Sequence, residues 1–172
     1  MKWKIVTART TKINRAATTP LHGVEPYCRD LNGWPRSWMG LEKDLPPGEH
    51  LVTLFRPFLE HLAASSLSPK TIQKHVDNMW VLGGEFIRDL HNDPPLRRRP
   101  VDQVLSKMIE YGGPLLYHAG EDQQRSFDST CRKFRSFLIE RHRRGSPSPT
   151  DSSDEAFFAI FMSCPSRHPA RR

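Results

Sequence analysis

Lysines and arginines at helical spacing are the residues of this chain that could do chemistry, and that chemistry is the binding of phosphate. Residues 121–144 hold seven cations against four acids. At about 100° per residue, one helical face would carry Arg125, Ser129, Arg132, Ser136 and Arg143, with Lys133 and Arg135 on its flanks. Guanidinium forks fit phosphate oxygens and guanine edges, and small serines allow a close approach to a nucleic-acid backbone. The alternative is a solvated face with intrahelical pairs such as Asp128–Arg132.

A second cationic group lies in "LSPKTIQKHVDNMW", residues 67–80. If this segment is a helix, Lys70, Thr71 and Lys74 lie in its first two turns, near backbone amides that favour anions. Acids follow on the same face, so we expect only this N-terminal end to approach DNA. The run Arg97–Arg99, in a loop bounded by prolines, could add phosphate contacts. The candidate DNA-binding residues are therefore Lys70, Thr71, Lys74, Arg97, Arg98, Arg99, Arg125, Ser129, Arg132, Lys133, Arg135 and Arg143.

Other residue types form no pattern that is typical of a catalytic or metal site. The eight histidines are scattered, without an H-E-x-x-H motif and without the Cys/His spacing of zinc sites. No Gly-rich phosphate loop follows a strand. We expect His75 and His118 to be surface or partly buried residues rather than general bases. The sequence thus predicts no catalytic residue, no metal and no cofactor.

The net charge of +7 is unevenly distributed along the 172 residues. Residues 1–19 carry five cations and no acid, and residues 51–145 carry fifteen cations against eleven acids. A basic arm beside a mildly basic core is typical of proteins that bind polyanions. Many ordinary basic proteins share this distribution, so it favours nucleic-acid binding only modestly.

The cysteine content and the apolar runs indicate the compartment. Cys28, Cys131 and Cys164 are an odd number without a C-x-x-C motif, which favours reduced thiols. The opening "MKWKIVTARTTK" has no apolar core of a secretory signal, and no apolar run approaches the roughly 20 residues that cross a bilayer. We expect a cytoplasmic protein with no membrane partner.

Four segments have the apolar period of amphipathic helices, and none alternates as a strand does. These segments are 51–64, 68–91, 101–112 and 121–143. Pro57 predicts a kink in the first segment, or a helix that starts near Arg56. Ser68 and Pro69 predict the start of the second. Gly83 and Gly84 cost about 1 kcal/mol each relative to alanine, and we expect another helix to cross closely there.

The regions around these helices have a different composition. Residues 1–50 predict a basic arm and an irregular lead-in, with Trp34 and Trp38 packed on the helices. Residues 145–172 begin as a linker, "GSPSPTDSSDE", and continue with the apolar "AFFAIFM", residues 156–162, which either folds back on the core or docks a partner. The expected fold is all-α: a small four-helix orthogonal bundle at 51–144, with an irregular N-terminal lead-in and a disordered C-terminal tail.

Three motifs resemble the core-binding (SAM-like, N-terminal) domain of tyrosine recombinases and phage-type integrases. They are Phe58-Leu59-x-x-Leu62, the run "LSPKTI" at 67–72 and Phe134-x-x-Phe137-Leu138. The resemblance covers roughly residues 51–144, and its motifs are moderately specific because Ser-Pro before a helix is common. It implies a helical domain that clamps one face of duplex DNA, with its second and fourth helices near the major groove.

The chain departs from that family in the residues that cleave DNA. A recombinase needs a second domain with an arginine, a lysine, an H-x-x-R element and a nucleophilic tyrosine. Only 28 residues follow Arg144, the last tyrosine is Tyr117, and we interpret "HPAR" at 168–171 as a chance match to H-x-x-R. We therefore expect a protein that is not an enzyme.

These observations leave a leading hypothesis and a rival. The leading hypothesis is a non-catalytic protein that binds double-stranded DNA, an accessory factor or remnant of a mobile element. The rival is a helical protein–protein interaction module that engages its partner through Trp34 and Trp38 or through residues 156–162. A truncated product without a role is a third possibility.

Overall fold

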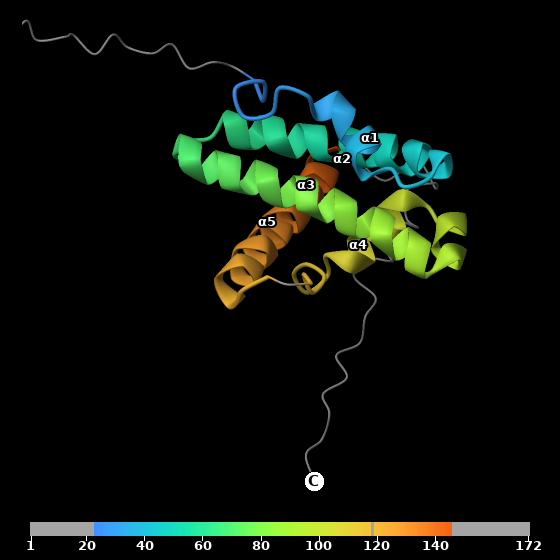
Figure 1. Ribbon diagram of the computed structural model, residues 1–172. Helices are drawn as coiled ribbons and strands as arrows, with labels where there is room; N and C mark the ends of the chain where they lie inside the picture. The colour runs from blue at the N-terminus through green and yellow to red at the C-terminus, as the bar shows by residue number, and fades with distance from the viewer. Residues whose placement is uncertain (1–22, 118, 146–172) are drawn as a thin grey trace, which may run out of the picture.

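Every regular element in the described part of the chain is helical. The computed structural model describes residues 23–117 and 119–145, and these ranges contain no strand (Figure 1). The α-helices are α1 (Trp34–Trp38), α2 (Leu45–Ala63), α3 (Pro69–Asn92), α4 (Val101–Met108) and α5 (Glu121–Gly145). The 3₁₀ helices are η1 (Leu31–Gly33), η2 (Glu42–Asp44) and η3 (Pro94–Arg98). The expected all-α class is confirmed. The basic arm at 1–19 and the linker and tail expected at 145–172 lie outside the described residues, except Gly145, which ends α5.

Helices α2 and α3 form an antiparallel pair that lies side by side in Figure 1. Ser68 caps α3, because its side chain accepts a hydrogen bond from the amide of Thr71, and Pro69 occupies the first helical position. Both features were predicted. The apolar stripe of α3 is buried throughout: Ile72, Val76, Met79, Leu82, Phe86, Ile87 and Leu90.

Helix α2 begins six residues earlier than its apolar period predicts. It starts at Leu45, so Pro46 and Pro47 lie in its first turn, where a missing backbone donor costs nothing. Pro57 lies inside the helix and does not end it, which corrects the expected start near Arg56. The expected boundary at residue 50 therefore falls within a helix.

The segment before α2 belongs to the core. Trp34 and Trp38 of α1 are each only 8% exposed, and their ring centroids lie 5.7 Å apart. Trp38 also meets the edge of Phe55 in α2 at 6.3 Å. The expected packing of both tryptophans is confirmed, and their use as a surface for a protein partner is wrong because little of either ring reaches solvent.

The packing of Trp38 also explains why position 83 of α3 is a glycine. A Cβ at Gly83 would overlap the indole ring of Trp38, whereas a Cβ at Gly84 would lie 3.6 Å from that ring, an ordinary contact. The expected close approach at these glycines is therefore confirmed for Gly83, and the element that approaches is α1.

Helix α5 closes the core by crossing the α2–α3 pair obliquely (Figure 1). Phe127, Cys131 and Phe134 on α5 have no exposed surface. The ring centroid of Phe134 lies 5.4 Å from that of Phe55, edge-on, and 5.1 Å from that of Phe58, tilted, so α2 and α5 meet through packed aromatic side chains.

Helix α4 ends at Met108, earlier than the expected stop at Gly112. Gly112 instead takes a φ of 142°, a conformation that side chains with a Cβ rarely adopt, in the turn that follows. Hydrogen bonds with Gln124 of α5 hold the segment that connects α4 to α5. Gln124 accepts a hydrogen bond from the amide of Leu116 and donates one to the carbonyl of Pro114.

Candidate functional site

A buried polar seam fixes how α3 crosses α5. The Nδ1 atom of His75 lies 2.8 Å from Oγ1 of Thr130, and Asn78 Nδ2 donates to the same hydroxyl at 2.8 Å. Thr130 in turn donates to the carbonyl oxygen of Ser126 at 3.1 Å. The hydroxyl then has only its lone pairs for the other two groups, which places the imidazole proton on Nδ1 of His75. His75 is thus more deeply buried than its sequence predicted.

One lysine on each helix lies near this seam. Burial lowers the pKa of His75, and the positive charges of Lys133 on α5 and Lys74 on α3 lower it further. Lys74 precedes His75 directly on α3, and Lys133 follows Thr130 by one turn of α5; both lysine side chains are exposed. The seam brings together two predicted cations that are far apart in the chain.

A groove lies beside the seam, between the C-terminal end of α2 and the C-terminal half of α5. Its volume is about 780 Å³. We call it the basic groove and define it by its apolar residues Phe58, Leu62, Leu67 and Phe137, its charged residues Arg132, Lys133, Glu140, Arg141 and Arg144, its histidine His61, and its serines Ser65, Ser129 and Ser136. Four arginine or lysine side chains face one carboxylate in it, so the groove is net positive.

The basic groove contains predicted and unpredicted residues. The structure brings Ser129, Arg132 and Lys133 together there, as the sequence predicted. It adds Arg141 and Arg144, which sequence reasoning did not choose. A helical wheel of α5 alone could not identify them, because the second wall of the groove comes from α2. Arg144 pairs with Glu140 at 2.9 Å, and an exposed pair of this kind is worth at most about 1 kcal/mol.

Other predicted residues lie near the basic groove without lining it. Lys70 lies one helical turn before Lys74 on α3 and is exposed. The Thr71 hydroxyl lies 2.8 Å from the hydroxyl of Ser68, so Thr71 takes part in the cap of the helix. Arg143 is exposed near the end of α5.

Arg125 is surrounded by acids. Its guanidinium lies 3.2 Å from a carboxylate oxygen of Glu121 and 3.4 Å from one of Asp122. All three side chains are exposed, so a phosphate that approached Arg125 would also meet two negative charges. Asp128, which the alternative of a solvated face paired with Arg132, accepts hydrogen bonds from Gln124 and from the amide of Gly113.

The loop arginines are separated from the basic groove. Arg99 and Arg135 line a different cavity, of about 570 Å³, against α4. Arg98 is exposed in η3. The predicted set of candidates therefore does not form one continuous surface.

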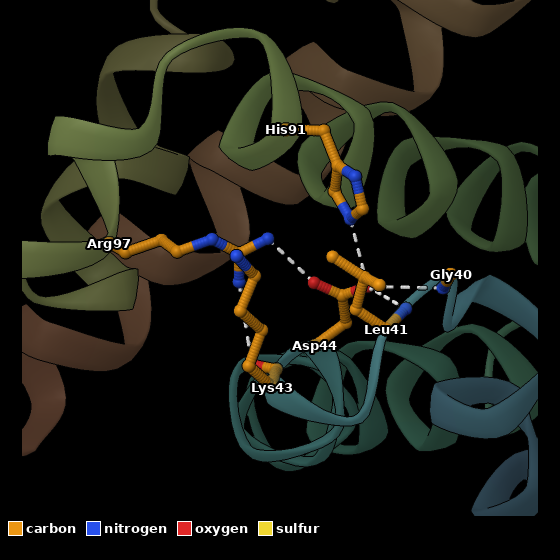
Figure 2. A network of polar contacts seen from close by, with 6 residues as sticks. All are labelled: Gly40, Leu41, Lys43, Asp44, His91 and Arg97. Carbon is orange, nitrogen blue, oxygen red and sulfur yellow. Dashed lines mark hydrogen bonds and ion pairs between the residues drawn. The ribbon is translucent and has the colours of Figure 1, made fainter.

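Arg97 belongs to a polar network that sequence reasoning missed (Figure 2). The Asp44 side chain has no exposed surface, and its Oδ1 atom accepts a hydrogen bond from Arg97 Nη2 at 2.6 Å. Its Oδ2 atom lies 2.8 Å from His91 Nε2 and accepts bonds from the amides of Leu41 at 2.7 Å and Gly40 at 3.0 Å. We leave Arg97 out of the interface because this carboxylate already binds it.

The same network sets the ionisation of Asp44. Burial alone would raise the pKa of this carboxyl group, but the hydrogen bonds from His91, Arg97 and the two amides outweigh burial and hold the pKa at about 2. Asp44 is therefore a permanent anion near neutral pH. It ties the lead-in before α2 to the end of α3 and to η3.

Metal-ligand clusters and reactive thiols were sought in residues 23–117 and 119–145. This part of the chain has no group of three or more His, Cys, Asp or Glu side chains that could hold a metal ion. Burial raises the pKa of Cys131 to about 12, so this cysteine is a protonated thiol. No helix within the same ranges is both long and apolar enough to span a bilayer.

Comparisons of the chain with protein-family models, with curated proteins and with solved structures found no match.

Proposed function

We propose that the chain is a non-catalytic protein that binds double-stranded DNA along the start of α3 and the C-terminal half of α5. One observation carries the proposal: the hydrogen bonds of His75 and Asn78 to Thr130 join α3 to α5 beside Lys74 on one helix and Lys133 on the other.

The basic groove extends this pair into a longer positive surface. Arg132 lies beside Lys133, and Arg141 and Arg144 follow toward the end of α5. Ser129 and Ser136 line the same groove and are small enough to let a phosphate backbone approach. The binding that we propose is electrostatic, so its affinity falls steeply with salt.

The resemblance to recombinase core-binding domains agrees with this proposal. The two helices that such domains place near the major groove correspond here to α3 and α5. By this reading the protein is an accessory factor or remnant of a mobile element that acts in the cytoplasm. The rival, a protein-interaction module, retains residues 156–162 as its expected surface, since Trp34 and Trp38 are buried.

The test is the affinity of the full chain for a random-sequence DNA duplex across a salt series. We expect Lys74→Ala combined with Lys133→Ala to weaken binding and to flatten the slope of log K against log salt by about two units. The matched control is Arg29→Ala combined with Arg36→Ala, which removes two exposed cations from the lead-in. A full chain that does not bind duplex at low salt, or equal slopes for the two double variants, would overturn the proposal.

A further inference from the structure

The basic groove has an apolar floor that DNA phosphates do not use. Phe137 and Leu67 are only partly buried there, next to the buried side chains of Phe58 and Leu62. Arginines and a lysine border this floor. A ligand that uses both features must place acidic groups directly beside large apolar groups.

The chain itself contains such a segment. Residues 156–162, "AFFAIFM", follow directly after Asp154 and Glu155, and Asp151 lies three residues earlier. No other stretch of the sequence joins a cluster of acids to seven consecutive apolar residues. The segment thus combines the two kinds of group, acidic and apolar, that the basic groove can bind.

The connection is long enough for this segment to reach the basic groove. Helix α5 ends at Gly145, and Arg141 and Arg144 of its last turns already line the basic groove. The five residues of 146–150 span up to about 17 Å when extended, and the twelve residues of 151–162 span about 40 Å more. The stretch of α5 from Ser129 to Arg144 is roughly 22 Å long at 1.5 Å per residue. The tail can therefore turn back along the whole basic groove.

We propose that residues 151–162 dock in the basic groove of their own chain. The acids pair with Arg132, Arg141 and Arg144, while the phenylalanines cover Phe137 and Leu67. The docked segment lies over cations that the proposed DNA interface uses, so it lowers the affinity for DNA. This last consequence rests on the proposed function, whereas the docking itself does not.

Photo-crosslinking of the full chain without DNA tests the docking. With p-benzoylphenylalanine in place of Phe158, we expect crosslinks within one chain to residues 58–67 and 132–144, mapped by mass spectrometry. Arg141→Glu combined with Arg144→Glu should reduce their yield several-fold, and the control Arg29→Glu combined with Arg36→Glu should not. Crosslinks to other surfaces, crosslinks between two chains, or a yield that the reversal leaves unchanged would overturn the docking.

Affinity for duplex DNA then tests the regulation separately. Asp151→Asn, Asp154→Asn and Glu155→Gln together should tighten binding at least several-fold more than the control Glu25→Gln, Glu42→Gln and Glu49→Gln, which also removes three acids. Equal gains in the two triple variants would overturn the competition with DNA. If groove crosslinks form and no variant binds DNA, the docking stands and the proposed function fails.

Discussion

His75 Nδ1 lies 2.8 Å from Thr130 Oγ1, inside the seam where α3 crosses α5. The two residues join helices that no local pattern of the sequence connects. Because the imidazole is buried and lies near two lysines, its neutral form is favoured in the folded protein. The pKa of His75 therefore depends both on how the two helices cross and on the positions of Lys74 and Lys133.

The stability of the protein should decline as the pH falls below about 6.5, the ordinary pKa of histidine. Below that pH the unfolded chain binds a proton at His75, while the folded protein resists protonation until the pH reaches its lower pKa. The His75→Gln variant should lack this component of the pH dependence. Urea unfolding between pH 5 and pH 8 measures it for both proteins. If the free energy of unfolding changed with pH in the same way for the wild-type protein and His75→Gln, folding would not lower the pKa of His75.

Replacement of Lys133 by alanine should raise the pKa of His75, because one of the two charges that oppose its protonation is removed. Lys74→Ala should raise it by a smaller amount, and the double variant should raise it furthest. The imidazole resonances in an NMR titration report this pKa directly and require no DNA. A pKa of His75 that stays constant in all three variants would place the lysines away from the seam.

Gly83→Ala and Gly84→Ala should have opposite effects on stability. The new Cβ at Gly83 would overlap the Trp38 ring, so we expect a loss of about 1–3 kcal/mol. The new Cβ at Gly84 lies 3.6 Å from that ring, so the better helix propensity of alanine should give a gain of up to about 1 kcal/mol. Thermal and urea unfolding of the two variants decide this. Equal losses would mean that α1 does not pack on α3 as described.

The sequence predicts the long helices well, but it predicts poorly where they begin and which short elements connect them. Apolar periodicity identifies α3 and α5 because each buries one continuous stripe. The start of α2 was missed because Pro46 and Pro47 look like a loop, although they suit a first helical turn. Helix α1 has five residues, too few to show a period.

The candidate site shows the same limit. Sequence reasoning chose the cations on the outer face of α5, whereas the basic groove also depends on a wall from α2 that only the fold supplies. Arg97 was chosen as a DNA-binding candidate because it lies in a run of three arginines. Its partner, Asp44, is 53 residues away in the chain, and no local signal connects them.

Asp44→Ala should cost roughly 3 kcal/mol, because it leaves the partly buried Arg97 without its anion and two amides without an acceptor. The wild-type protein should also lose stability as the pH falls from about 3.8 toward the folded pKa of about 2, since the unfolded chain takes up the proton first. Acid and urea unfolding measure both effects. The control is Arg98→Ala, an exposed neighbour whose loss should stay within about 0.5 kcal/mol.

Arg125 and Arg132 lie two turns apart on α5 and should contribute unequally to DNA binding. Glu121 and Asp122 already compensate Arg125, whereas Arg132 lines the net-positive basic groove. We expect Arg132→Ala to lower the salt slope by about one unit and Arg125→Ala to leave it nearly unchanged. Glu121→Gln combined with Asp122→Asn should then make the Arg125→Ala effect visible, because the arginine becomes available to phosphate. Equal losses from the two single variants would instead mean that the DNA follows the whole outer face of α5, and the interface would have to be moved from the basic groove to that face.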